Sequence, residues 1–400
     1  MPGTHPLKRL HALDALRGAM MLLGLVLHSA ASYTTYSLEA AWPYQDAHRT
    51  GLADWLVFII HLFRMPAFFV MAGFFAAFLY AREGTAGFLA HRARRLLLPL
   101  VAAWIVIFPL VRSGFAYALT GGGRVGLDAA TQGLTIAPYA DPSLAHLWFI
   151  YYLIIFCLVA AVVVPIVERV AGGARGILLN AFARMAPTVS GCLLLGVVSA
   201  VTLLPMSKPT LDTSFAFVPA LRVLVAYAVF FTFGWLLFAR REVVPAVGQR
   251  PWRYLSAAFL ASIVYMVIVV STAATPTFAG HLAGISAAGI AMWLWIYGVT
   301  GFFVRYFEEA RPLQRYLSDA SYWMYLIHLP FAIWIPGVLA PLAIPGALKL
   351  LIVLAATSAV TVATYHLFVR STAIGAFLNG RKFERALPRV AGTPASVVSE

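Results

Sequence analysis

The chain has 400 residues, of which 62% are hydrophobic and only 11% are charged. Soluble domains carry about 25% charged residues, so this composition excludes a water-soluble enzyme. The net charge of +14 would suggest nucleic-acid binding in a soluble protein. In a chain this apolar it instead indicates basic residues retained on the cytoplasmic side of a membrane, and we expect no nucleic-acid partner.

Apolar runs of about 20 residues recur along the whole chain, which is typical of an all-α polytopic integral membrane protein. The first run resembles a signal peptide in its flanks, but its internal arginine favours a retained helix. Cys157 and Cys192 both lie in apolar runs and predict neither a disulfide nor a metal site. In chain order, we expect about ten transmembrane helices, at residues 12–32, 52–80, 94–118, 144–170, 187–206, 217–239, 252–272, 278–304, 316–336 and 348–370.

The distribution of basic residues predicts the topology of these helices. With a cytoplasmic N-terminus, 21 of the 29 Lys and Arg residues fall in cytoplasmic segments, which include residues 81–95 and 165–186. Five fall in outward loops: Arg49, Arg112, Arg124, Lys208 and Lys349. This bias favours ten helices with both termini in the cytoplasm. Residues 1–370 would form a single transmembrane domain, and residues 371–400 a poorly ordered basic tail. Two outward loops are candidate walls of a binding site: the loop at 33–51, which is rich in Tyr and Trp, and the loop at 119–143, which is long and Gly-rich.

The first predicted helix, "LDALRGAMMLLGLVLHSA", carries Asp14, Arg17 and His28. Arg17 and His28 are eleven residues apart, so they share one helix face to within about 20° and lie about 16 Å apart along the axis. Each could be explained separately, Arg17 by reaching the inner interface or pairing with Asp14, and His28 by bonding a carbonyl. Together on one stripe they favour a polar path that faces a cavity.

The second predicted helix carries His61 and Arg64, again three residues apart. Arg64 lies mid-helix, too deep to reach the interface, so we expect an anionic partner: a carboxylate, a phosphate, or an acidic residue such as Asp14. Arg222 in the sixth helix is similar but lies nearer a helix end, where an interfacial location explains it.

A dense basic cluster, "HRARRLLLP", precedes the third predicted helix and contains Arg92, Arg94 and Arg95. It has two explanations. It could anchor the cytoplasmic end of the helix, or it could bind phosphate, because guanidinium groups match phosphate oxygens and Arg92 and Arg95 are three residues apart.

His146 and Trp148 in "AHLWFIYYL" and His328 in "SYWMYLIHLPF" lie near the ends of apolar runs. Packing at the interface or in the core explains each of them alone. A basic cytoplasmic mouth, a stripe from Arg17 to His28 and further histidines nevertheless favour chemistry that crosses the membrane. A histidine in a cavity is the commonest general base.

Four stretches in this order resemble the acyltransferase family 3 of membrane O-acyltransferases. They are Arg17–x10–His28, "FRMPAFFVMAGFF", Arg92–x–x–Arg95 and "SYWMYLIHLP", and the resemblance covers residues 8–370. It implies a ten-helix core that moves an acyl group from cytoplasmic acyl-CoA to a hydroxyl of an extracytoplasmic glycan. It also implies that His28 is the essential histidine, that Arg17 is its partner, and that Arg92 and Arg95 lie near the CoA phosphates.

The opening helix and "RPLQRYLSDASYWMYLIHLPFAIW" most resemble the branch that succinylates osmoregulated periplasmic glucans. That resemblance implies a bacterial inner-membrane protein with succinyl-CoA as donor, a periplasmic glycan as acceptor and no tightly bound cofactor or metal. His28 would deprotonate the sugar hydroxyl, or become acylated itself. Arg64 is the candidate for the distal carboxylate of a succinyl group, while Asp14 pairs with Arg17. The alternative is a multi-helix transporter or flippase of a glycan or anionic solute, which needs no CoA affinity.

Overall fold

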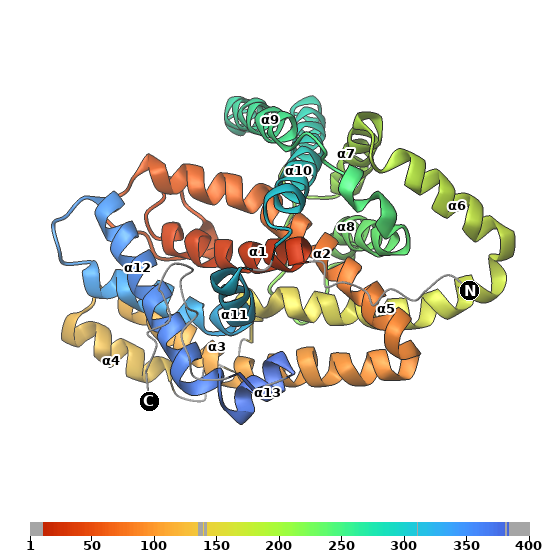
Figure 1. The fold of residues 1–400 in the computed structure, drawn as a ribbon. Helices are drawn as coiled ribbons and strands as arrows, with labels where there is room; N and C mark the ends of the chain where they lie inside the picture. The colour runs from red at the N-terminus through yellow and green to blue at the C-terminus, as the bar shows by residue number, and fades with distance from the viewer. Residues whose placement is uncertain (1–10, 135–138, 140–141, 310, 381, 384–400) are drawn as a thin grey trace, which may run out of the picture.

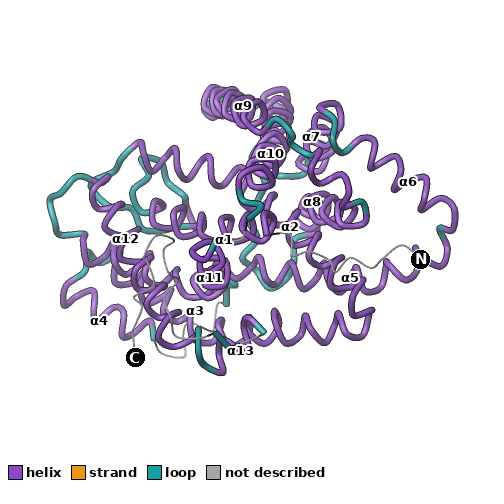
Figure 2. The backbone as a smooth tube through the Cα atoms, in the orientation of Figure 1, coloured by secondary structure: helices purple, strands orange, loops and turns teal. Residues whose placement is uncertain are grey.

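The computed structural model describes residues 11–134, 139, 142–309, 311–380 and 382–383, and these residues contain helices and loops but no strand (Figure 2). The helices are α1 (His11–Ala31), α2 (Gly51–Arg92), α3 (Leu98–Leu119), α4 (Gly123–Gly133), α5 (Trp148–Val170), α6 (Gly172–Met185), α7 (Val189–Leu203), α8 (Leu221–Ala239), α9 (Pro251–Ala273), α10 (Phe278–Tyr306), α11 (Pro312–Leu339), α12 (Gly346–Thr364) and α13 (Ala373–Asn379). Short 3-10 turns lie at Glu39–Ala41, Ala145–Leu147 and Arg241–Ala246, and π-turns at Ala93–Leu97 and Tyr365–Val369.

Within the described residues, eight helical segments are long and apolar enough to cross a membrane, or nine if the bent pair α6–α7 is one broken span. One of the eight, Gly51–Leu119, has 69 residues. A straight helix of that length would measure about 100 Å, against a hydrocarbon core of about 30 Å, so it covers two of the ten predicted helices. The all-α polytopic fold is therefore confirmed, and the cytoplasmic location of both termini stays a prediction.

Three segments expected to be loops are helical. The predicted loop at 81–95 continues α2, with a backbone break at Gly84, whose φ of 65° suits a residue without Cβ, and a π-turn before α3. Helix α4 lies in the predicted outward loop 119–143, and α6 in the predicted cytoplasmic segment 165–186. Helix α6 meets α7 at 110°. Apolar periodicity finds membrane spans but does not register short helices that flank them.

Helix α1 lies at the centre of the fold, packed against α2, α10, α11 and α12 (Figure 1). Helix α2 packs closely on α8, because Gly73 and Gly234 let the two backbones meet. A Cβ at Gly234 would lie 1.9 Å from the carbonyl oxygen of Val70. Small residues of this kind are the usual route to tight helix packing in a membrane. The central position of α1 surrounds His28 with side chains from several helices.

Of the predicted tail 371–400, the described part includes the short helix α13, which packs near α11 and the π-turn Ala93–Leu97. Residues 384–400 lie outside the described residues, as do Lys8 and Arg9 before α1.

Candidate active site

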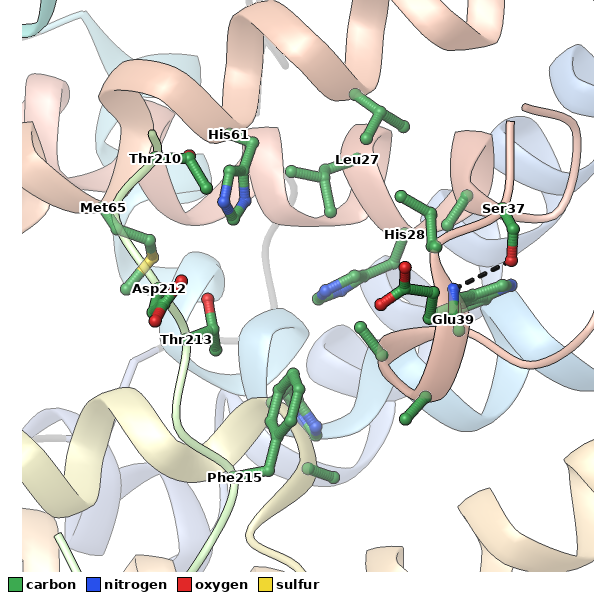
Figure 3. A pocket seen from close by; sticks show the side chains of 18 of the residues that line it. Leu27, His28, Ser37, Glu39, His61, Met65, Thr210, Asp212, Thr213 and Phe215 are labelled. Carbon is green, nitrogen blue, oxygen red and sulfur yellow. Dashed lines mark hydrogen bonds between the residues drawn. The ribbon is translucent and has the colours of Figure 1, made fainter. Parts of the chain in front are cut away.

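A cavity of about 1400 Å³ opens beside the C-terminal half of α1. Its walls come from α1, α2, α3, α5, α9 and α11, from the segment before α5, and from two loops, residues 36–43 and 207–215 (Figure 3). The predicted site residues that line it are His28, His61, Arg64, His146 and Trp148. The structure therefore brings together residues of α1, α2 and α5 around one space.

The imidazole of His28 contacts two other rings. On one side the indole of Trp42 lies nearly parallel to it, at 8° and 5.8 Å between ring centroids. Trp42 is itself fixed, because its indole N–H donates to the Ser32 hydroxyl at 2.9 Å. The second ring is that of His328, whose Nε2 atom lies 2.7 Å from His28 Nδ1. With one ring nitrogen engaged and one face covered, the ring has little freedom to rotate.

The loop that carries Trp42 is anchored by a buried ion pair. Lys349 Nζ lies 2.9 and 3.0 Å from the two carboxylate oxygens of Asp46, and both side chains are almost fully buried, at 0% and 1% exposure. The backbone N–H of Asp46 donates to the Ser32 carbonyl. Burial and the neighbouring Asp46 carboxylate raise the pKa of the Tyr44 phenol, which stays protonated and donates to Asp46 at 3.4 Å. Helix α12 thus holds the wall of the cavity that covers His28.

His146 and His328 are bound to the backbone of α11. His328 Nδ1 lies 2.8 Å from the Tyr325 carbonyl, and His146 Nε2 lies 3.0 Å from the same oxygen and 3.1 Å from the Leu326 carbonyl. Pro330 explains why the Leu326 oxygen is available, since a proline inside a helix cannot donate to the carbonyl four residues earlier. His146 donates to that freed oxygen instead, and its own Nδ1 has no partner among the described residues.

Arg64 is a buried cation at the cavity wall, with 8% of its surface exposed. Its guanidinium lies against α1 at Gly24, where an added Cβ would come within 2.3 Å of Nη1. Gly24 precedes His28 by four residues, about 6 Å along the helix. Within the described residues Arg64 has no ion pair or hydrogen bond, and its Nε atom is buried without a partner. The expected acidic side-chain partner is therefore not found in the described part of the chain.

The predicted pair of Asp14 and Arg17 is present. Arg17 Nη2 lies 2.9 Å from the Asp14 carboxylate, and Nη1 contacts the Met21 sulfur at 3.7 Å. Neither charged residue is part of the cavity lining. Arg222, for which an interfacial location was the simpler explanation, pairs with Asp212 at 3.4 Å on the loop that forms the cavity wall.

The basic cluster before α3 does not form one phosphate grip in this structure. The Arg95 guanidinium donates to the backbone carbonyls of Ala376 and Phe377 at the end of α13. Arg92 Nη2 lies 3.4 Å from the Phe75 carbonyl, and its guanidinium covers the ring of Phe88. Arg94 is exposed. To share a phosphate, Arg92 and Arg95 would have to leave these partners.

Sequence reasoning missed the residues that hold the site in place. Trp42 and Asp46 gave no signal beyond the aromatic content of the loop at 33–51, and Lys349, the partner of Asp46, lies 303 residues away in α12. Pro330, a proline two residues after a buried histidine, could have suggested a freed carbonyl. Among the described residues, no group of three or more metal-binding side chains occurs.

The chain was compared with curated proteins, with solved structures and with models of protein families. Glucans biosynthesis protein C from Salmonella heidelberg and that from Salmonella enteritidis are each 32% identical to it over 98 residues, which is 24% of this chain and 24% of each relative. The match thus spans about a quarter of the length of these relatives. No solved structure matches the chain. The model of family 3 acyltransferases, described as an acyltransferase domain, matches residues 10–366, and the chain is therefore a member of that family of membrane acyltransferases.

Proposed function

We propose that this acyltransferase moves an acyl group from cytoplasmic acyl-CoA to a hydroxyl of a periplasmic glycan, with His28 as the general base. The observation that carries the proposal is the fixed imidazole of His28 in the wall of a 1400 Å³ cavity. Typical small-molecule pockets measure about 300–1,000 Å³, so this one has room for a sugar unit and the reactive end of an acyl-CoA.

The reaction needs one proton acceptor and one leaving group. His28 takes the proton of the sugar hydroxyl as the oxygen attacks the thioester carbonyl carbon, forming the C–O bond of the new ester. The C–S bond then breaks, and the CoA thiolate leaves with the proton from the His28 imidazolium. The products are the ester and free CoA. Direct transfer and an acyl-histidine intermediate both satisfy this balance.

The remaining candidate residues are proposed to bind either the acyl donor, acyl-CoA, or the acyl acceptor, the glycan. Arg92, Arg94 and Arg95 would bind the CoA phosphates by charge-assisted hydrogen bonds, after Arg92 and Arg95 release their backbone partners. His61 and Trp148 line the cavity and would contact the acceptor (Figure 3 shows His61). The donor path past Arg17, which is paired with Asp14 outside the cavity lining, remains part of the proposal.

A succinyl donor is the finer part of the proposal, and Arg64 supports it. The guanidinium of Arg64 lies about one helical turn from His28, which is about 6 Å along α1. The two carboxyl carbons of a succinyl group are at most about 4 Å apart, and a hydrogen bond of about 2.9 Å spans the remainder. A buried, unpaired guanidinium at this distance suits the distal carboxylate of a succinyl thioester. The glucan named in the relatives is the acceptor we propose.

Replacing His28 tests the general base directly. Glycans from cells that carry the gene, lack it, or carry His28→Ala are compared by mass spectrometry, with membrane insertion checked by immunoblot. His281→Ala is the control, because His281 lies in α10 away from the cavity lining. We expect the acyl mass to disappear with His28→Ala and to persist with the control. An acyl mass that survives His28→Ala would contradict the proposal.

Binding of CoA separates this function from a transporter or flippase. We expect purified protein to bind CoA and to lose glycan acylation with His28→Ala. A protein that exports glycan without CoA affinity would show the transporter alternative instead.

A further inference from the structure

Hydrogen bonding fixes the position of the proton on His328. A carbonyl oxygen only accepts, so the 2.8 Å contact between His328 Nδ1 and the Tyr325 carbonyl requires a proton on Nδ1. A second proton, on Nε2, would make His328 a fully buried cation. No carboxylate among the described residues pairs with it, and a buried unpaired charge is costly. His328 is therefore neutral, and its Nε2 atom carries a lone pair.

That lone pair determines the tautomer of His28. His28 Nδ1 lies 2.7 Å from His328 Nε2, and two bare nitrogens would repel one another. The hydrogen bond therefore places a proton on His28 Nδ1 and leaves His28 Nε2 without one. His28 lines the cavity, so its basic nitrogen is the atom available to a substrate.

His146 does not take this role in the structure, although its ring centroid lies 6.4 Å from that of His28. Its Nε2–H is used by the carbonyls of Tyr325 and Leu326, which leaves Nδ1 as an acceptor only. The Nδ1 atom of His146 has no hydrogen-bond partner among the described residues, and the structure records no hydrogen bond between the rings of His146 and His28. The nitrogen that accepts from His28 Nδ1–H is therefore Nε2 of His328.

We propose that His328 is the positioning residue that holds His28 in the base-competent tautomer, which rests on the proposed role of His28 as general base. When His28 takes the hydroxyl proton on Nε2, the resulting imidazolium still donates its Nδ1–H to the neutral His328. The proton is then in place for the departing thiolate. His328 does not contact the cavity, so it acts through His28 and not on the substrate.

Two isosteric replacements test the proposal. The amide of glutamine reaches the position of a histidine Nε2 and that of asparagine the position of Nδ1. His328→Gln therefore retains an acceptor for His28 Nδ1–H, whereas His328→Asn retains only the contact with the Tyr325 carbonyl. We expect kcat to fall about 10²- to 10⁴-fold in His328→Asn, with KM unchanged, because general acid–base catalysis contributes about that factor and a catalytic histidine in the wrong tautomer loses about 10⁴-fold. His328→Gln should keep kcat within about 10-fold of the parent, and His281→Asn should match the parent.

Equal losses in His328→Gln and His328→Asn would show a packing role and overturn the proposal, as would full activity of His328→Asn. Nitrogen-15 NMR of histidine-labelled protein provides a readout without activity, the His28 signals being assigned by their loss in His28→Ala. We expect a bare Nε2 and a protonated Nδ1 on His28. The reverse assignment would overturn the tautomer proposal alone, whereas an active His28→Ala enzyme would instead remove the proposed function.

Discussion

Gly24→Ala is a test of the Arg64 site that leaves the charge in place. The added Cβ would lie 2.3 Å from Arg64 Nη1, while ordinary contacts begin near 3.4 Å, so the guanidinium must move by at least about 1 Å. The clash is with the far end of a flexible side chain, and alanine favours a helix over glycine by about 1 kcal/mol. The helix should therefore keep its stability while the cation loses its position.

A misplacement of about 1 Å in a substrate-binding group can cost about 10²-fold in rate. We expect Gly24→Ala to lower kcat/KM for succinyl-CoA by up to that factor, and to change kcat/KM for butyryl-CoA, which lacks the distal carboxylate, by less than about 3-fold. Purified enzyme in detergent, a glucan acceptor and detection of released CoA provide the assay. Gly173→Ala in α6 is the matched control, because nothing lies within 4 Å of its added Cβ.

Unchanged transfer from both donors would refute the reasoning that Arg64 must stay against Gly24. An equal loss with both donors would show that Arg64 acts on the reacting centre and not on the distal carboxylate.

Two further predictions concern the support of the site and the donor. Lys349→Met leaves Asp46 buried without its cation and should lower the free energy of unfolding by about 3–5 kcal/mol, seen as a lower melting temperature in detergent. Adding Asp46→Asn should recover part of the loss. An unchanged melting temperature in Lys349→Met would contradict the anchoring role. Replacing Arg92 and Arg95 together by Ala should weaken CoA binding by about 10²-fold in calorimetry, since a hydrogen bond to a charged group contributes about 1.5–3 kcal/mol. Unchanged affinity would show that the basic cluster only anchors the cytoplasmic end of the helix.

The sequence predicts the membrane-spanning elements well because their signal is local. The first helix was expected at 12–32 and is found at His11–Ala31, and the seventh was expected at 252–272 and is found at Pro251–Ala273. A run of about 20 apolar residues has no stable alternative in lipid, so its ends follow the change in composition. The sequence does not predict that α2 continues through residues 81–92, because the charged residues there are typical of a loop, although they can lie on a helix outside the hydrocarbon.

The candidate site was predictable only in part, because its supporting contacts join distant segments. His28 is conspicuous as an ionisable group in a membrane helix, but its partner His328 is 300 residues away. Lys349 lies 303 residues from Asp46 and was counted as an ordinary residue of an outward loop. No spacing in the chain reports such contacts, since they depend on how α1, α11 and α12 pack.

One physical rule connects what the sequence showed with what only the structure could show. A polar group inside a membrane protein needs a partner, so each such residue in the sequence indicates that a partner exists but does not show which residue it is. Arg17 pairs with Asp14, and His328 donates to the Tyr325 carbonyl. His146 donates to the Leu326 carbonyl that Pro330 leaves free. Arg64 departs from the rule within the described residues, although it is among the most deeply buried of the cations. A cation that the fold leaves unpaired beside a large cavity is best explained by a partner that arrives with the substrate, which is why Arg64 rather than Arg17 carries the expectation of an anionic donor.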